Sequence, residues 1–414
     1  MEKQQLLYDL FKAYYEARKN KRNTLNQLDF EINLEENLIK LYEELINWTY
    51  KIWKSIYFIQ QTPVKREIFA WNFRDRVVHH LIYNYISPIF EREFIYDSYS
   101  CRKWKWTSFW IKRLQKFIRS SSENYTKDSY ILKLDVSWYF MSMNKSILFE
   151  KIKKSLNKIW ISSLSKGSTE VRGDGLELKY THNLDYYFII NLIQKVIFND
   201  CTVNSIFKWN RQDYIWLPKN KSLFFAKNNT GLPIWNLTSQ IFSNIYLSDF
   251  DKYIKNELKI KYYGRYVDDF CIIHTNKDYL KSLIPKITQY LQQNLWLTIH
   301  PKKIYFQHYS KGVLFLGVFI KPYRTYIRKR TVWFFYKKIE NLNNDFMNKN
   351  YEMNNILAKD FLSVVNSYLG MFKHHKSYKI RKKILIEKIN KNFWNYFYIN
   401  NDYTIIKRKN KILI

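Results

Sequence analysis

Two adjacent aspartates beyond the middle of the chain are the residues most able to carry out chemistry. Asp268 and Asp269 stand between two runs rich in apolar residues, 263–267 and 270–273. The pattern predicts a strand, a tight acidic turn and a returning strand, because aspartate is rare inside strands and neighbouring carboxylates repel each other. Divalent cations bound at the turn would remove that repulsion. An ordinary hairpin turn exposed to water is the alternative interpretation of such a pair.

A second acidic position favours the cation site. Residues 130–136 alternate in the manner of a buried strand, and this strand ends on Asp135. Two-metal phosphoryl transfer requires carboxylates from separate segments that hold two cations about 3.5–4 Å apart. Magnesium prefers oxygen ligands and keeps some of its waters, so a few carboxylates suffice. Asp135, Asp268 and Asp269 are therefore predicted to hold two Mg²⁺ ions.

The composition indicates the kind of partner such a site would serve. The chain has 414 residues, with 69 Lys and Arg against 36 Asp and Glu, giving a net charge of +33. Apolar residues make up 46% and aromatic residues 19% of the chain, which excludes a disordered basic tail. So large a positive charge on a folded protein indicates a polyanion, either nucleic acid or an anionic membrane. The charge is spread along the chain and not concentrated on one amphipathic helix, which favours nucleic acid.

The expected location is the cytoplasm, without a membrane partner. The first residues contain no basic region followed by a long apolar run, so we expect no secretory signal. Charged residues interrupt every apolar stretch before it reaches the roughly 18 residues of a membrane span. The three cysteines lie far apart without a CxxC pair, which suits a reducing compartment.

Four regions must position the acidic residues. Region 1–60 is predicted to be helical, because Leu34, Leu38, Leu41 and Leu45 recur at helical spacing. Region 61–127 is dense in basic and aromatic residues, and region 128–325 mixes helical and strand patterns. Region 326–414 is rich in Lys, Asn and Ile without alternation, so we expect a helical bundle there.

Several motifs resemble one family of polymerases. Tyr266–Asp269 resembles the YxDD signature of reverse transcriptases, and Leu134–Val136 resembles their first palm motif. Gly231–Gln240 is similar to a segment typical of the reverse transcriptases of diversity-generating retroelements. Four further blocks are similar to that family: Arg66–Ala70, Asn72–His80, Asp97–Lys103 and Asn366–Gly370. The matches run in the family's order from about residue 50 to residue 380.

The resemblance implies an α+β fold of the right-hand polymerase type, with fingers, a palm containing an antiparallel sheet, and a helical thumb. By this division residues 1–60 are a helical extension, 61–127 the fingers, 128–325 the palm with fingers insertions at about 150–230, and 326–414 the thumb. The implied activity is RNA-directed DNA polymerase. Such an enzyme would make cDNA from a template-repeat RNA and would be error-prone at template adenines.

The resemblance also implies roles for individual residues. Asp135, Asp268 and Asp269 would be catalytic, and the backbone carbonyl of Val136 would join them as a metal ligand. The implied nucleotide-binding residues are Arg66, Arg74, Phe140, Ile234, Gln240 and Lys302. The implied primer grip comprises Phe315, Leu316 and Gly317.

Two of these assignments have an alternative interpretation. Phe140 lies where the family places a bulky gate against a ribose 2′-hydroxyl; packing in the core is the alternative interpretation. Ile234 stands where many reverse transcriptases carry glutamine. An apolar side chain there cannot form a hydrogen bond across the pocket, so discrimination between base pairs should fall. Isoleucine could instead simply fill a hydrophobic gap.

The implied partners are a template RNA, an RNA–DNA duplex and dNTPs, together with a small basic accessory protein, often oligomeric. Two other interpretations remain open. One is a retron, group II intron-like or defence-associated reverse transcriptase. The other is a catalytically impaired relative that only binds nucleic acid.

The balance of glycine and tryptophan is unusual. Glycine occurs 8 times and tryptophan 14 times, whereas average usage would give about 29 glycines. Nine tryptophans stand where the family usually has glycine or where a tight loop would prefer it: Trp53, Trp104, Trp106, Trp110, Trp138, Trp216, Trp235, Trp296 and Trp333. Our hypothesis is that the gene comes from a lineage that reads UGA as glycine, and that these codons were translated as tryptophan.

Overall fold

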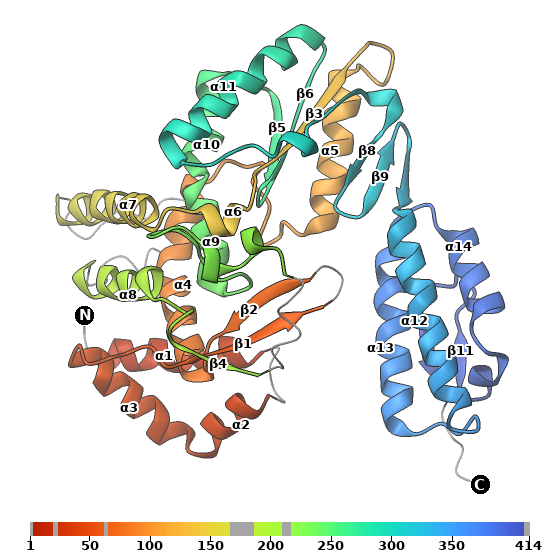
Figure 1. The fold of residues 1–414 in the computed structure, drawn as a ribbon, viewed down its shortest axis with the longest axis horizontal. Coiled ribbons are helices and arrows are strands. Elements are labelled where there is room, and N and C mark those ends of the chain that lie inside the picture. The colour runs from red at the N-terminus through yellow and green to blue at the C-terminus, as the bar shows by residue number, and fades with distance from the viewer. Residues whose placement is uncertain (1–2, 20–23, 62–64, 166–185, 209–216, 410–414) are drawn as a thin grey trace. The chain divides into compact units, whose positions relative to one another are not determined.

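The computed structural model describes residues 3–19, 24–61, 65–165, 186–208 and 217–409. The chain divides into two compact units (Figure 1). The first contains Met1–Trp106, Lys133–Ile272 and Asp278–Tyr305. The second contains Thr107–Leu132, Ile273–Lys277 and Phe306–Ile414. Each unit is thus assembled from segments that lie far apart in the sequence.

The first unit begins with helices. They are α1 (Lys3–Arg18), α2 (Leu25–Ile32), α3 (Leu34–Ile46) and, after a strand pair, α4 (Phe73–Glu93). Helix α1 packs on α4, and the Tyr85 hydroxyl donates a hydrogen bond of 2.8 Å to Asp9 Oδ2. Leu38, Leu41 and Leu45 are buried on one face of α3, which confirms the predicted helix.

A three-stranded sheet follows these helices, with the order β2-β1-β4. Strands β1 (Ser55–Gln60) and β2 (Arg66–Ala70) are antiparallel, with Ile56 opposite Ala70 and Gln60 opposite Arg66. Strand β4 (Ser205–Phe207) runs parallel to β1. The pattern along β1 alternates between buried and half-buried side chains, as expected for a strand with one covered face.

A four-stranded sheet carries the acidic residues, with the order β5-β6-β3-β7. Its strands are β3 (Tyr130–Asp135), β5 (Tyr262–Tyr266), β6 (Asp269–His274) and β7 (Tyr305–His308). Strand β3 and the hairpin β5–β6 confirm the strands predicted around Asp135 and around the aspartate pair. Strands β3, β6 and β7 each contribute residues to both units.

The remaining helices of the first unit surround this hairpin in the sequence. They are α6 (Tyr139–Ser142), α7 (Lys145–Ser165), α8 (Tyr186–Phe198), α9 (Leu237–Tyr246), α10 (Ser248–Lys252) and α11 (Lys277–Leu295). Short 3-10 turns at Lys219–Lys221, Leu223–Phe225 and Pro301–Lys303 and a π-helical turn at Tyr253–Glu257 connect them. Helix α9 packs on α4 and α7, and most of its side chains are buried.

The second unit combines small sheets with helices. Helix α5 (Thr107–Ser121) precedes a three-stranded sheet of β8 (Val313–Phe315), β9 (Val318–Lys321) and β10 (Arg324–Ile327). Helices α12 (Lys329–Met347), α13 (Asn355–Phe372) and α14 (Tyr378–Lys383) follow, and α12 and α13 lie side by side (Figure 1). Phe335, Phe361 and Phe393 are fully buried in the core that these helices share with the chain's last elements.

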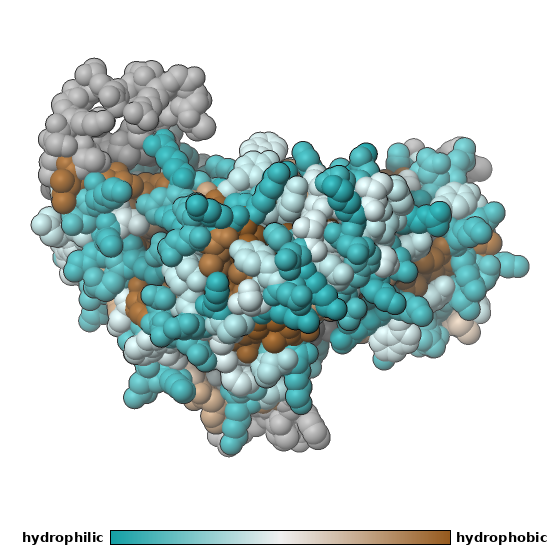
Figure 2. All heavy atoms as spheres, turned by 90° about the horizontal axis from the view of Figure 1, so that it is seen from above, coloured by the Kyte–Doolittle hydropathy of each residue, from teal (hydrophilic) through white to brown (hydrophobic). Residues whose placement is uncertain are grey.

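The structure confirms a mixed α+β fold with antiparallel sheets. Two expectations were incomplete. Region 1–60 was predicted to be helical, but its last residues form strand β1, which pairs with β2. The region after residue 326 was predicted to be a helical bundle, but it also contains the hairpin β11 (Phe397–Ile399) and β12 (Ile406–Arg408). Among the described residues, no helix is both long and apolar enough to cross a membrane. On the face shown in Figure 2, hydrophilic side chains cover much of the surface, and apolar ones form patches between them.

Candidate active site

Asp135 is the last residue of β3, where the sheet gives way to a turn. Its backbone oxygen accepts a hydrogen bond of 2.9 Å from the His300 amide, and the next residue, Val136, forms an isolated bridge with Ile299. The buried side chains of Leu132 and Leu134 anchor the strand behind it. The backbone of Asp135 is therefore fixed at the end of a strand that is held on both sides.

The aspartate pair occupies the turn between β5 and β6. Val267 and Asp268 form the turn, and Asp269 is the first residue of β6. Val267 adopts a positive φ of 56°, which is rare for a β-branched residue. Phe270, Cys271 and Ile272 are fully buried, so the strand after the turn is firmly packed.

The structure brings the three aspartates together. The amide of Val136 lies 3.4 Å from the backbone oxygen of Asp268, so the ends of β3 and the hairpin are adjacent. Their carboxylates repel one another: the charges of Asp269 and Asp135 both raise the pKa of Asp268. The three carboxylates therefore lie close enough for their charges to interact.

Two lysines partly neutralise this cluster. Lys303 Nζ lies 2.8 Å from Asp135 Oδ1, and Lys133 Nζ lies 3.1 Å from Asp269 Oδ1. Burial lowers the pKa of Lys133, but Asp269, Cys271 and Asp135 together outweigh it, so the pKa of this lysine is raised overall. Each of these two aspartates thus has an ammonium partner.

Asp268 carries the strongest sign of unbalanced charge. Burial, followed by the charges of Asp269 and Asp135, raises the pKa of its carboxyl from 3.8 to about 7. Lys303 opposes this shift without cancelling it. Burial also raises the pKa of Asp269, although Lys133 counteracts it. The three aspartates therefore carry more negative charge than Lys133 and Lys303 balance.

The donor set suits Mg²⁺ in its chemistry, because carboxylate oxygens are the ligands this ion prefers. Across the described ranges, however, no three His, Cys, Asp or Glu side chains converge closely enough to hold a metal ion as they stand. Asp135 and Asp269 contact lysines instead. Cation binding would thus require these carboxylates to turn away from their ammonium partners.

Phe140 and the segment around Ile234 lie close to each other. The amide of Leu232 donates a 2.9 Å hydrogen bond to the Phe140 oxygen, and the amide of Gly231 donates one to Met143. Phe140 and Ile234 are both half-buried. Gln240 lies in the first turns of α9, also half-buried. The structure thus places the first two residues near each other, while their implied roles stay predictions.

The two candidate arginines differ in their surroundings. Arg66 is the first residue of β2 and is exposed, so a ligand in solution can reach its side chain. Arg74, near the start of α4, is 4% exposed and pairs with both Glu44 and Asp75. Its guanidinium also lies over the Trp53 ring, at 4.7 Å. Arg74 is therefore engaged within the protein, and a nucleotide would have to compete with two carboxylates for it.

Lys302 belongs to the first unit, and the residues of the implied primer grip belong to the second. Lys302 is exposed in the turn Pro301–Lys303, and its neighbour Lys303 is the one that contacts Asp135. Phe315 ends β8 in the second unit, and Leu316 and Gly317 form the turn to β9. These residues make the predicted hairpin, and their contact with a primer stays a prediction.

Several of the nine tryptophans that we predict to be glycine codons have a left-handed backbone conformation. Trp104, Trp138, Trp235 and Trp296 all have positive φ, between 45° and 73°. Trp110 differs, because it is fully buried in helix α5 and packs edge to face on Phe315 at 5.4 Å. None of Trp53, Trp106 and Trp333 has positive φ, and Trp216 lies outside the described residues. Positive φ thus distinguishes four of the nine tryptophans from the other members of the set that the structure describes.

Sequence reasoning missed the two lysines. Lys133 stands two residues before Asp135 on the same strand, so the two side chains share a face of the sheet. That spacing could have identified Lys133. Lys303 could not be told from Lys302, because only the turn geometry decides which of the two faces Asp135.

Comparisons with known proteins give a limited result. No protein-family model matches the chain, and no curated protein matches it. The chain is similar to several solved telomerase structures. Apo telomerase from Candida tropicalis matches with a TM-score of 0.46 and 14% identity, over 80% of this chain and 55% of that one. The same enzyme truncated from its C-terminal domain gives 0.41 and 16%, over 66% and 55%.

Telomerase from Candida albicans in complex with a TWJ fragment of telomeric RNA gives a TM-score of 0.44 and 10% identity, over 86% of this chain and 62% of that one. The chain thus spans between 55% and 62% of the length of these telomerases. With TM-scores below 0.5, these similarities do not establish a family or an activity.

Proposed function

We propose that this protein is an RNA-directed DNA polymerase, a reverse transcriptase of the kind found in diversity-generating retroelements. One observation carries the proposal: the end of β3 and the β5–β6 turn are adjacent, with the Val136 amide 3.4 Å from the Asp268 backbone oxygen. The charges of Asp135 and Asp269 accordingly both raise the pKa of the Asp268 carboxyl. Carboxylates from separate segments are what two-metal nucleotidyl transfer requires. The ordered polymerase-like motifs and the charge of +33 support the same conclusion.

Asp135, Asp268 and Asp269, with the Val136 carbonyl, would hold two Mg²⁺ ions. When bound, these ions lower the pKa of an attacking 3′-hydroxyl and neutralise the charge of the leaving pyrophosphate. The chain's own residues contribute mainly by positioning and charge balance. In the absence of cations, Lys303 partly neutralises the charge of Asp135, and Lys133 that of Asp269.

The remaining parts of the proposal concern the substrates. Lys and Arg side chains would bind the phosphates of an RNA–DNA duplex, so affinity should fall steeply with salt. Arg66, exposed at the start of β2, would contact the incoming dNTP. Ile234 would permit errors at template adenines, because its side chain offers no hydrogen bond to a base pair. In the cytoplasm, a small basic accessory protein would bind this enzyme and help to present the template RNA to it.

The direct test is primer extension on an RNA template with Mg²⁺ and dNTPs. Asp135→Asn and Asp268→Asn should each lower the rate by about a hundredfold or more, because they remove proposed metal ligands. Asp278→Asn is the matched control, since that carboxylate is 88% exposed and lies 3.6 Å from the surface ammonium of Lys281. Extension by Asp268→Asn at the rate of the unaltered protein would exclude the proposal.

The fidelity claim needs a separate measurement. Sequencing of the products from a template with all four bases should show more misincorporation opposite adenine than opposite the others. Ile234→Gln should reduce that excess, because it restores a side chain able to form hydrogen bonds. Equal error at every base would leave a polymerase outside the diversity-generating family.

A catalytically impaired relative is the second candidate function. Trp138 and Trp235 favour it, because both carry a large ring on left-handed backbone. Trp138 stands three residues after Asp135 and Trp235 directly after Ile234 in the sequence. Such a protein would bind the RNA–DNA duplex but would show no extension even with Mn²⁺. The same primer-extension assay separates the two candidates.

A further inference from the structure

A buried arginine lies directly behind the turn that carries Asp268. Arg265 in β5 has a fully buried side chain. Its Nη1 donates a hydrogen bond of 2.9 Å to the backbone oxygen of Val267, the residue before Asp268. Val267 has positive φ, a conformation that a β-branched residue keeps only when its surroundings impose it. The Arg265 contact is one such constraint, and it acts on the residue adjacent to the carboxylate.

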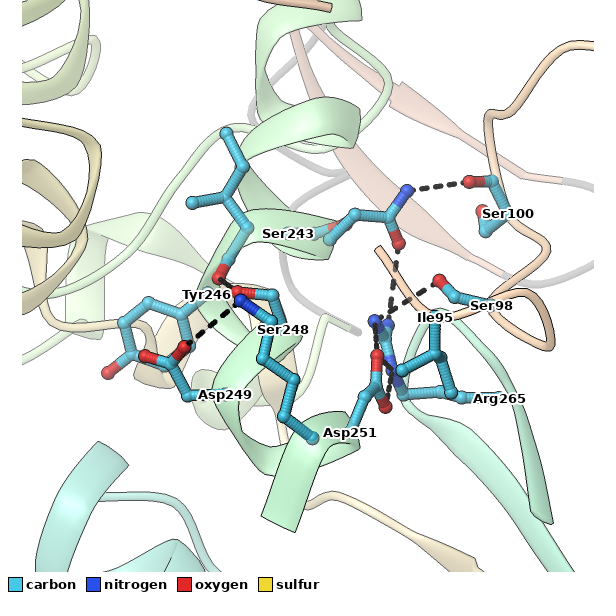
Figure 3. Close-up of polar contacts among 12 residues, drawn as sticks. Ile95, Ser98, Ser100, Ser243, Tyr246, Ser248, Asp249, Asp251 and Arg265 are labelled. Carbon is cyan, nitrogen blue, oxygen red and sulfur yellow. Dashed lines mark hydrogen bonds and ion pairs between the residues drawn. The ribbon is translucent and has the colours of Figure 1, made fainter. Parts of the chain in front are cut away.

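The guanidinium is itself held from three sides (Figure 3). Its Nε and Nη2 donate to Asp251 Oδ1 and Oδ2 at 2.8 and 2.6 Å, a two-nitrogen contact with one carboxylate. Nη2 also lies 3.4 Å from Ser98 Oγ, and Nη1 lies 3.4 Å from Asn244 Oδ1. Both Asp251 and Arg265 are fully buried. A guanidinium whose three nitrogens all have hydrogen-bond partners cannot rotate freely.

The backbone of Arg265 is fixed as well. Its amide donates to the Asp97 oxygen at 2.9 Å, and its own oxygen accepts from the Tyr99 amide at 3.1 Å. The segment 97–99 thus runs along the outer edge of β5. Asp251 receives a further hydrogen bond of 2.5 Å from the Tyr263 hydroxyl, also in β5. Helix α10, this edge segment and the hairpin are therefore joined through one guanidinium.

We infer that Arg265, oriented by Asp251, is a positioning residue that sets the Val267 turn and thereby the direction of the Asp268 and Asp269 carboxylates. The inference rests on the proposed function, because it assigns Arg265 to the proposed cation pocket. Lysine cannot replace the arginine, since one ammonium cannot contact both Asp251 oxygens and the Val267 carbonyl with the same geometry. The residue touches no proposed ligand and acts only through the turn.

The test measures Mn²⁺ binding and primer extension in the same variants. Arg265→Lys keeps the charge beside Asp251 and loses the fork. The double variant Arg265→Met with Asp251→Leu removes the pair without leaving a buried charge unpaired. Arg18→Lys is the matched control, because Arg18 makes a similar two-nitrogen contact with Glu31 in α1 and α2.

In both Arg265 variants the Mn²⁺ dissociation constant, measured by electron paramagnetic resonance, should rise about tenfold or more. The Mg²⁺ concentration for half-maximal extension should rise in parallel, while Arg18→Lys leaves both unchanged. If the Arg265 variants are destabilised but keep normal Mn²⁺ affinity, Arg265 is merely structural and the inference is overturned. If the unaltered protein binds Mn²⁺ but never extends a primer, the proposed function fails, and the Mn²⁺ measurement still decides the role of Arg265.

A separate observation concerns five tryptophans on left-handed backbone. Trp48, Trp104, Trp138, Trp235 and Trp296 have φ between 45° and 73°. Tryptophan is poorly suited to this region, because its Cβ crowds the following carbonyl. Each of the five rings is also between 49% and 77% exposed, so burial does little to offset the strain. Glycine occupies such positions without steric cost.

Trp48 shows the pattern most clearly, although it is not among the nine tryptophans singled out from the sequence. It follows the last residues of α3, and its amide donates to the Leu45 oxygen at 3.4 Å. The Thr49 amide donates to the Glu44 oxygen at 2.9 Å. These two hydrogen bonds define the Schellman motif, whose left-handed position is usually glycine. Trp296 likewise stands immediately after α11.

We propose that these five positions, and not the buried Trp71 and Trp110, are UGA codons read as glycine in the cell of origin. Trp71 and Trp110 have negative φ and are at most 4% exposed, so a glycine there would leave a cavity. Sequencing the gene and mass spectrometry of the protein from its own cells provide the test. We expect UGA and a glycine mass at the five positions, and UGG at Trp71 and Trp110. UGG at any of the five, or UGA at either buried position, overturns the proposal.

Discussion

The raised pKa of Asp268 makes the stability of the cation-free protein depend on pH in a defined way. Its carboxyl titrates near 7 in the folded protein and near 3.8 when unfolded. Because the folded pKa is the higher one, proton binding favours the folded state. The stabilisation is complete below the unfolded pKa and is lost as the pH rises through about 7.

The magnitude follows from the two titration curves. Between pH 6 and pH 8 the fraction of Asp268 that remains protonated in the folded state falls by about tenfold. That change corresponds to about 1.4 kcal/mol in the free energy of unfolding. Buried His79 and His80, whose pKa values are lowered to about 3 and about 4, act in the opposite direction as the pH falls. A comparison with Asp268→Asn cancels their contribution.

The assay is denaturant unfolding of the cation-free protein and of Asp268→Asn at pH 6 and pH 8. Relative to the variant, the unaltered protein should gain about 1.4 kcal/mol on going from pH 8 to pH 6. Mg²⁺ should abolish the gain, because a bound cation replaces the proton. Parallel pH dependence of the two proteins, within about 0.4 kcal/mol, would show that Asp268 is not in a charge-rich pocket.

Three further predictions test other parts of the account. Lys133→Met should lower the free energy of unfolding by about 1–3 kcal/mol, because it leaves Asp269 without its ammonium partner, and Mg²⁺ should restore part of the loss in a melting experiment. Arg74→Gln should cost about 3–5 kcal/mol in denaturant unfolding because two carboxylates lose their partner. By contrast, the exposed Arg66→Gln should cost under about 0.5 kcal/mol and raise KM for dNTP; equal effects would refute this contrast. Affinity for an RNA–DNA duplex should fall by about 10³–10⁵ between 50 and 200 mM salt if 6–10 phosphates are contacted, and a flat salt dependence in a fluorescence titration would argue against duplex binding.

The strands that carry the aspartates could be predicted from the sequence because apolar runs stand directly before Asp135 and on both sides of the Asp268–Asp269 pair. Strand β3 and the hairpin β5–β6 lie in a buried sheet, so the pattern of apolar residues determines their limits to within a residue or two. The short strands β11 and β12 escaped prediction because three residues are too few to show a period.

The contacts of charged side chains could not be predicted in the same way. The sequence treats Arg66 and Arg74 alike, yet one is exposed and the other lies between two carboxylates. The role of Arg265 was also hidden, because its partner Asp251 belongs to a separate helix and only the folded chain brings them together. Lys303 depends on a turn that the sequence does not specify.

The central claim is that Asp135 and the Asp268–Asp269 turn form a single cation pocket, and iron-mediated cleavage tests it most directly. Fe²⁺ bound in place of Mg²⁺, with ascorbate and peroxide, cuts the backbone near the metal. We predict two cuts in the same protein, one near residue 135 and one near residue 268, both suppressed by excess Mg²⁺ and both lost in Asp135→Asn. Cleavage confined to the 268 turn and unaffected by Asp135→Asn would contradict the account.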